Sequence, residues 1–119
     1  MATIKSYTSL EQSKKLAEIL PLESADMYYT HGSTTPDIMI GSKQDYRCYT
    51  MCWSLAALLD VIPRNLKIVL AVNDYWDGNA VKYKYAIGSV EHNNYDCYAD
   101  NHVDACYELI IKLHEQNLL

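Results

Sequence analysis

The spacing of hydrophobic and polar residues along this chain predicts three helices. The first opens at a capping box, formed either by Thr8 and Glu11 or by Ser9 and Gln12, and is expected to run until Pro21 stops it. The second is expected in the segment YTMCWSLAALLDVIPR, whose apolar residues recur at the spacing of one helical face. The third follows Asn101, a favourable N-cap residue, and continues nearly to the C-terminus with one apolar face.

Four or five short strands are expected between these helices. Residues 26–31 and 37–40 flank a GSTTP turn segment and predict a hairpin. Residues 66–72 (LKIVLAV) are continuously apolar, which is typical of a strand in the middle of a sheet. The pair Asp77-Gly78 predicts a turn into the alternating segment VKYKYAIG, and residues 95–99 favour one further edge strand.

These elements give the order α-β-β-α-β-β-(β)-α. Because hairpins predominate over crossover connections, the prediction is an α+β fold with three helices and a mainly antiparallel sheet of four to five strands. No shift in composition and no linker divides the chain of 119 residues, so a single domain over residues 1–119 is expected.

Composition and charge place the chain among globular cytoplasmic proteins. The first twenty residues lack the continuous apolar segment of a secretory signal, and no run of 18 apolar residues predicts a membrane span. The four cysteines are therefore expected to remain free thiols in a reducing compartment. The net charge of −5 argues against nonspecific binding of nucleic acid.

Tyrosine is unusually frequent, with eleven Tyr and no Phe. One interpretation is that Tyr fills half-buried strand positions, where the ring packs and the hydroxyl reaches water. The other is an exposed recognition surface, because Tyr supplies a large contact area with few rotamers to immobilise.

With WSLAALLDVIP, the Tyr-rich hairpin and ADNHVDACYELIIKLHEQNLL located, the chain resembles a group of small proteins carried by prophages and mobile elements of gut Bacteroidetes. The resemblance extends from Leu10 onward and is most specific in those two helical segments. The group often has Pro after the N-cap Asn, whereas this chain has His102, which suggests a surface capping position for that residue. The group has no assigned activity, so the resemblance implies a setting and no mechanism.

Cysteine and histidine offer two chemical hypotheses. Cys48 and Cys52 are spaced four residues apart, as are His102 and Cys106, and the two pairs could supply a tetrahedral metal site of thiolates and imidazole. Against this, Cys52 and Cys106 fall at core-facing positions, where Cys acts as a small hydrophobe. A thiol enzyme could use Cys97 with His92 and Asp96, although no family signature surrounds them.

Other chemistry is weakly indicated. The segment from Asp74 to Asn79 lacks the alternating acidic ligands of a calcium loop, and no phosphate loop, nucleophile elbow or HExxH motif is present, so no cofactor is expected. Lys82 and Lys84 beside Tyr83 and Tyr85 could bind single-stranded nucleic acid, but strand alternation sends lysines and tyrosines to opposite faces.

The leading hypothesis is a noncatalytic protein-interaction module of a mobile element, with an aromatic contact surface. The candidate contact residues are Trp76, Tyr83, Tyr85, Tyr95 and Tyr98. The partner is expected to be a protein, and homodimerisation through an edge strand is a related possibility. The alternatives are a small Cys/His metal-binding protein or enzyme, and a single-stranded nucleic-acid binder.

Overall fold

The computed structural model describes residues 5–30, 32–38, 49–89 and 96–119, without the side chains of Lys82 and Tyr83. Within these residues the fold is α+β, as predicted, with three helices and six strands. The strands form two three-stranded antiparallel sheets, so the expectation of one four- to five-stranded sheet was wrong. The chain divides into an N-terminal unit, Ser6–Val61, and a C-terminal unit that comprises Ile62–Leu119 together with the segment ending at Lys5.

In the N-terminal unit, helix α1 (Leu10–Ala17) begins at the second of the two predicted capping frames. The Ser9 hydroxyl accepts a hydrogen bond from the Gln12 amide, and the Gln12 side chain accepts one from the Ser9 amide. The helix ends at Ala17, before the expected Pro21, and a short 3-10 helix (Leu22–Ser24) follows.

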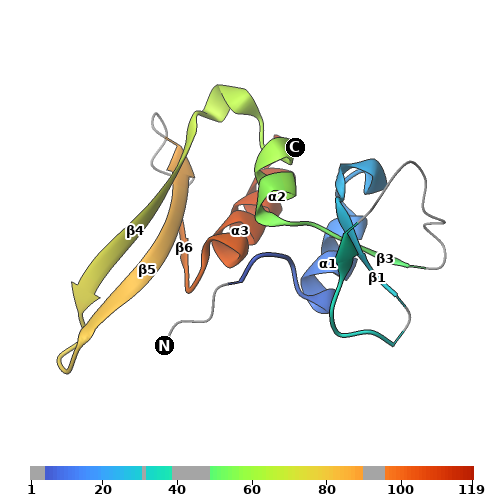
Figure 1. The fold of residues 1–119 in the computed structure, drawn as a ribbon. Coiled ribbons are helices and arrows are strands. Elements are labelled where there is room, and N and C mark those ends of the chain that lie inside the picture. Colours follow the sequence, from blue (N-terminus) through green and yellow to red (C-terminus); the bar gives the residue numbers. More distant parts are fainter. Residues whose placement is uncertain (1–4, 31, 39–48, 90–95) are drawn as a thin grey trace. The chain divides into compact units, whose positions relative to one another are not determined.

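The predicted first hairpin is confirmed, although its strands are short. Strand β1 (Met27–Tyr29) pairs with β2 (Asp37–Ile38), with Met27 opposite Ile38. Strand β3 (Thr50–Cys52) lies on the other side of β1, so the sheet order is β2-β1-β3. Helix α1 contacts β3 (Figure 1).

The second predicted helix starts later than the sequence pattern indicates. Residues 50–52 form β3, and helix α2 (Leu55–Val61) begins only after Ser54. The Asp26 carboxylate accepts hydrogen bonds from the Ser54 amide (2.9 Å) and hydroxyl, while the Ser54 oxygen accepts from the Ala57 amide (3.2 Å). These contacts fix Ser54 as the N-cap and leave the preceding residues extended. Met51 is buried because it lies in the sheet, not because it shares the helical face of Leu58.

In the C-terminal unit, a 3-10 helix (Arg64–Leu66) leads into β4 (Ile68–Trp76), which pairs over its full length with β5 (Val81–Ser89). Strand β6 (Cys97–Ala99) pairs with β5, so β4 and β6 are the two edges of this sheet. Figure 1 shows β4 and β5 as long strands that run past the short β6. The predicted hairpin and the final strand are confirmed, but the LKIVLAV segment lies at an edge of the sheet and not at its centre.

Helix α3 (His102–Glu115) contacts β5 and β6. The Asn101 side chain accepts a hydrogen bond from the Asp104 amide at 2.8 Å, as the N-cap prediction requires. The core of this unit lies between α3 and the sheet and includes these side chains: Ile87, Cys97, Val103, Cys106, Leu109, Ile110 and Leu113.

Candidate functional site

A strip of apolar side chains is exposed on the β4–β5 hairpin. Almost the whole of β4 is exposed, although its sequence is that of a core strand. We use the name hairpin surface for these exposed residues: Val69, Leu70, Val72, Tyr75, Trp76 and Val81. Soluble proteins rarely leave large apolar side chains contiguous on one element unless something binds there.

The side chains of β4 are exposed because α3 packs mainly on β5 and β6. Ile87 on β5 lies directly opposite Leu70 on β4, so both point to the same face of the sheet. Ile87 is 1% exposed under α3, whereas Leu70 is 37% exposed. The helix therefore lies mainly over β5 and β6, and reaches β4 at the Ala71 carbonyl through His102.

Strand alternation distributes the hairpin surface over both faces of β4. Leu70, Val72 and Trp76 point to the face that carries α3, and Val69 and Tyr75 point to the other. Because β4 pairs on one edge alone among the described residues and its side chains are exposed, the strand can bind a partner through backbone and side chains together.

The hairpin tip is a hydrogen-bonded turn, as the Asp-Gly pair predicts. The Asp77 carboxylate accepts hydrogen bonds from the amides of Asn79 (2.8 Å) and Ala80 (2.9 Å). Gly78 has a φ of 102°, which L side chains rarely adopt. The turn sets Trp76, 66% exposed, opposite Val81 at the end of the ladder.

The five predicted contact residues differ in how far their side chains are exposed. Trp76 and Tyr98 are exposed. Tyr85 is half-buried, with its ring edge-on to the His102 ring at a centroid distance of 5.0 Å. Tyr95 and the side chain of Tyr83 lie outside the described residues.

Sequence reasoning missed the aliphatic part of the surface, which is formed by Val69, Leu70, Val72 and Val81. The signal that could have found it is the topology: the Asp-Gly turn pairs residues 68–76 with the following strand on one side. The turn fixes a neighbour on that side alone, and the sequence does not determine which other predicted strand, if any, pairs on the other side.

Several tyrosines support the packing interpretation of the tyrosine excess. Tyr29 is buried, and its hydroxyl donates to the Thr8 carbonyl at 2.8 Å. The rings of Tyr28 and Tyr49 contact each other at a centroid distance of 4.9 Å. Burial raises the pKa of Tyr29 and, to a smaller extent, that of Tyr107. The exposed strip is therefore mainly aliphatic, with Trp76 and Tyr75 as its aromatic members.

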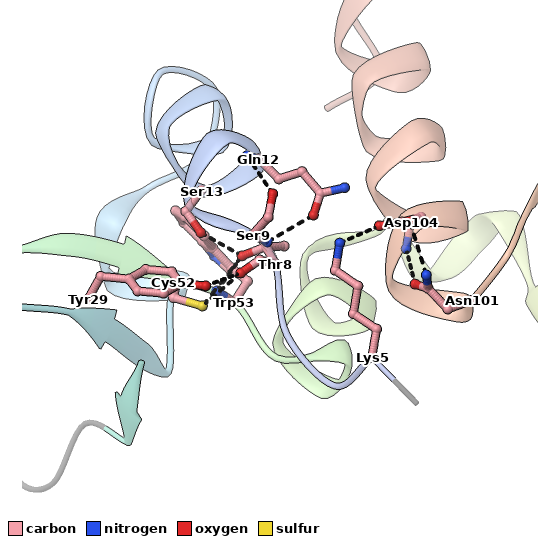
Figure 2. A network of polar contacts seen from close by, with 10 residues as sticks. All are labelled: Lys5, Thr8, Ser9, Gln12, Ser13, Tyr29, Cys52, Trp53, Asn101 and Asp104. Carbon is pink, nitrogen blue, oxygen red and sulfur yellow. Dashed lines mark hydrogen bonds and ion pairs between the residues drawn. The ribbon is translucent and has the colours of Figure 1, made fainter. Parts of the chain in front are cut away.

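A buried polar cluster in the N-terminal unit centres on Thr8 (Figure 2). Its hydroxyl oxygen lies 2.8 Å from the Ser13 oxygen and 3.5 Å from the Cys52 sulfur, and it accepts a hydrogen bond from the Trp53 amide at 3.2 Å. The Thr8 amide in turn donates to the Trp53 carbonyl at 3.0 Å. The cluster joins the segment before α1 to the end of β3, and burial raises the pKa of the Cys52 thiol. This environment suits a structural thiol and not a nucleophile.

The four candidate metal ligands are spread over the chain. Cys52 belongs to the N-terminal unit, His102 and Cys106 belong to the C-terminal unit, and Cys48 lies outside the described residues. His102 is the first residue of α3, as the N-cap prediction implies, and its Nε2 donates to the Ala71 carbonyl at 3.0 Å. Among residues 5–30, 32–38, 49–89 and 96–119, no three His, Cys, Asp or Glu side chains are grouped closely enough to hold a metal ion.

The thiol-enzyme and nucleic-acid hypotheses gain no support from the described residues. Burial raises the pKa of Cys97 and raises that of Cys106 to about 12, whereas a nucleophilic thiol needs a lowered pKa. His92 lies outside the described residues. Lys84 pairs with Asp100 at 3.8 Å, which offsets part of the positive charge on this side of β5.

No family model, curated protein or solved structure matches this chain. Within the part of the chain that the structure describes, no helix has the length and hydropathy needed to cross a membrane.

Proposed function

We propose that this chain is a noncatalytic protein-interaction module and that the hairpin surface is its contact surface. The observation that supports the proposal is the exposure of β4, where a strand with the sequence of a core element has Val72 51% exposed and Trp76 66% exposed. Full burial of an exposed large apolar side chain is favourable by about 1.5–3 kcal/mol, and each of these side chains gains the share of it that corresponds to its exposed fraction when a partner covers it.

The chemistry of the surface favours a protein partner. An open strand edge with aliphatic side chains on both faces can accept another strand, with backbone hydrogen bonds and side-chain contacts acting together. Trp76 supplies an aromatic anchor at one end of the strip, and aromatic residues are enriched among the side chains that dominate binding energy. We also propose that the chain acts for a prophage or other mobile element. This part of the proposal is supported by the resemblance of the segments WSLAALLDVIP and ADNHVDACYELIIKLHEQNLL to small proteins of such elements.

The test is capture by the tagged full chain from its native cell at two salt concentrations, with protein and nucleic acid in the eluate identified. Val72→Lys and Trp76→Ser are compared with Leu118→Ser, which changes a residue that is 45% exposed near the C-terminus and outside the hairpin. Far-ultraviolet circular dichroism and the Tm of each variant verify folding. We expect one stoichiometric protein that both hairpin variants lose and Leu118→Ser retains. Capture that is unaffected by the hairpin variants, or capture of nucleic acid alone, would overturn the proposal.

A further inference from the structure

The outer edge of β4 has a regular set of outward-directed backbone groups. The Asp77 amide donates to the Ala80 carbonyl at 3.3 Å, so these two residues form a hydrogen-bonded pair at the end of the hairpin. In an antiparallel ladder, hydrogen-bonded and non-hydrogen-bonded pairs alternate. The continuous β4–β5 register therefore directs the N–H and C=O of alternate β4 residues away from β5; these residues are Ile68, Leu70, Val72, Asp74 and Trp76.

This edge lacks the features that normally prevent strands from pairing across molecules. Natural edge strands are short, or carry proline, bulges or inward-pointing charges. Strand β4 is nine residues long, pairs without a bulge, and contains neither proline nor lysine. Asp74 is its one charged residue. Among the described residues, β4 pairs with β5 alone.

The distal half of the hairpin also has little support within its own unit. Strand β6 pairs only with Tyr85, Ala86 and Ile87 of β5. Within the part of the chain that the structure describes, β4 therefore belongs to a ribbon of two strands from Asn73 to Trp76, and such a ribbon is marginally stable in water. A further strand along β4 would make this end three strands wide.

Resting on the function proposed above, we infer that the protein partner is a second copy of this chain, with β4 pairing antiparallel to β4 about a twofold axis at Val72. The two sheets then join into one sheet of six strands, β6-β5-β4-β4-β5-β6. Val72 is the midpoint of β4, so this register matches every outward-directed residue of one copy with an outward-directed residue of the other.

Side chains also match in this register. Ile68 lies opposite Trp76, Val69 opposite Tyr75, and Val72 opposite its own copy. Aromatic and β-branched residues are favourable cross-strand partners. Helix α3 lies mainly over β5 and β6 and reaches β4 at the Ala71 carbonyl, while the β4 side chains of these pairs include the exposed Val69, Val72, Tyr75 and Trp76.

Charges support the same register. Lys67 precedes β4 and Asp77 follows it, so pairing about Val72 brings opposite charges together at both ends of the interface. A shift of the axis to Asp74 would place two carboxylates directly opposite each other, which is destabilising. A shift to Leu70 would leave Asp74 and Trp76 without partners on the other strand.

Two substitutions of the same kind, two residues apart on the same face, test the register. Val72→Lys places two ammonium groups opposite each other at the axis. Leu70→Lys places a cation opposite Asp74 of the second copy, and symmetry creates this pair twice. Two such pairs change the dimer Kd by roughly two- to thirtyfold in the favourable direction.

The measurement is sedimentation equilibrium of the purified full chain over a concentration series, with circular dichroism to verify folding. We expect a dimer for the natural chain and a Kd for Leu70→Lys at least tenfold below that for Val72→Lys. A monomer at all concentrations, or a ratio below tenfold, would overturn the self-pairing. The proposed interaction function is judged separately: it survives a monomeric result if Trp76→Ser abolishes capture of a different protein, and it fails if capture is unchanged.

Discussion

Replacement of Thr8 by Val tests whether the buried polar cluster stabilises the N-terminal unit. Valine keeps the shape of threonine and removes the hydroxyl that accepts from the Trp53 amide and contacts the Ser13 oxygen. Thr8 and Ser13 are fully buried, so water cannot replace the lost partner. An unsatisfied buried donor costs about 1–3 kcal/mol and a lost neutral hydrogen bond about 0.5–1.5 kcal/mol, which together predict a loss of about 1.5–4.5 kcal/mol.

The assay is urea unfolding followed by tryptophan fluorescence. The chain has two tryptophans, and Trp53 is fully buried in the N-terminal unit while Trp76 is exposed on the hairpin. In a Trp76→Ser background the signal reports Trp53 alone. The matched control is Thr8→Ser, which keeps the hydroxyl and is expected to lose about 1 kcal/mol from the missing methyl group.

A double-mutant cycle with Ser13→Ala separates the hydrogen bond from packing. Because Ser13 has already lost this partner in Thr8→Val, the two changes together should cost about 0.5–1.5 kcal/mol less than the sum of the single changes. A Thr8→Val variant within about 0.5 kcal/mol of the parent, or strict additivity, would refute the assignment of stability to this cluster.

Three further predictions concern the C-terminal unit. Burial raises the pKa of Cys106 from 9.0 to about 12, so the folded state holds this proton more tightly than the unfolded state. The resulting contribution to the free energy of unfolding is complete below pH 9, and it falls by up to about 1.4 kcal/mol per pH unit as the pH rises from 9 toward 12. Chemical denaturation at pH 8 and pH 10.5 should show a smaller loss for Cys106→Ala than for the natural chain, and equal losses would contradict the assignment. Asn101→Ala should lower stability by about 0.5–2 kcal/mol in thermal unfolding, and Asn101→Ser should restore most of it; no difference between the two variants would exclude the capping role. Gly78→Ala should cost about 1 kcal/mol or more because φ is 102°, although no atom lies within 4 Å of the added Cβ, and an unchanged Tm would show that the turn relaxes freely.

Local signals in the sequence predicted most of the helix and turn chemistry. The Ser9 capping frame, the Asn101 N-cap and the Asp77-Gly78 turn depend on interactions between residues a few positions apart, so the sequence contains their cause. The apolar face of α3 was predicted for the same reason, since its 3.6-residue period is a local property.

The predictions for residues 50–52 and for the position of β4 in its sheet were wrong because both depend on contacts between residues far apart in the sequence. Residues 50–52 fit a helical period, but strand β1 and the Asp26 carboxylate, more than twenty positions away, decide that they are extended. The apolar run in β4 predicts a central strand because such runs are usually buried on both faces. Its edge position depends on where α3 stops and on the absence of a neighbouring strand among the described residues, which hydrophobicity alone does not encode.

Amide hydrogen exchange along β4, followed by NMR at high and low protein concentration, tests most directly whether its outer edge is the contact surface. The amides of Val69, Ala71 and Asn73 point toward β5 and should be protected at both concentrations. Those of Leu70, Val72 and Asp74 point outward, and we predict protection in the concentrated sample that disappears on dilution. Exchange of these three amides at the unprotected rate in the concentrated sample would contradict it.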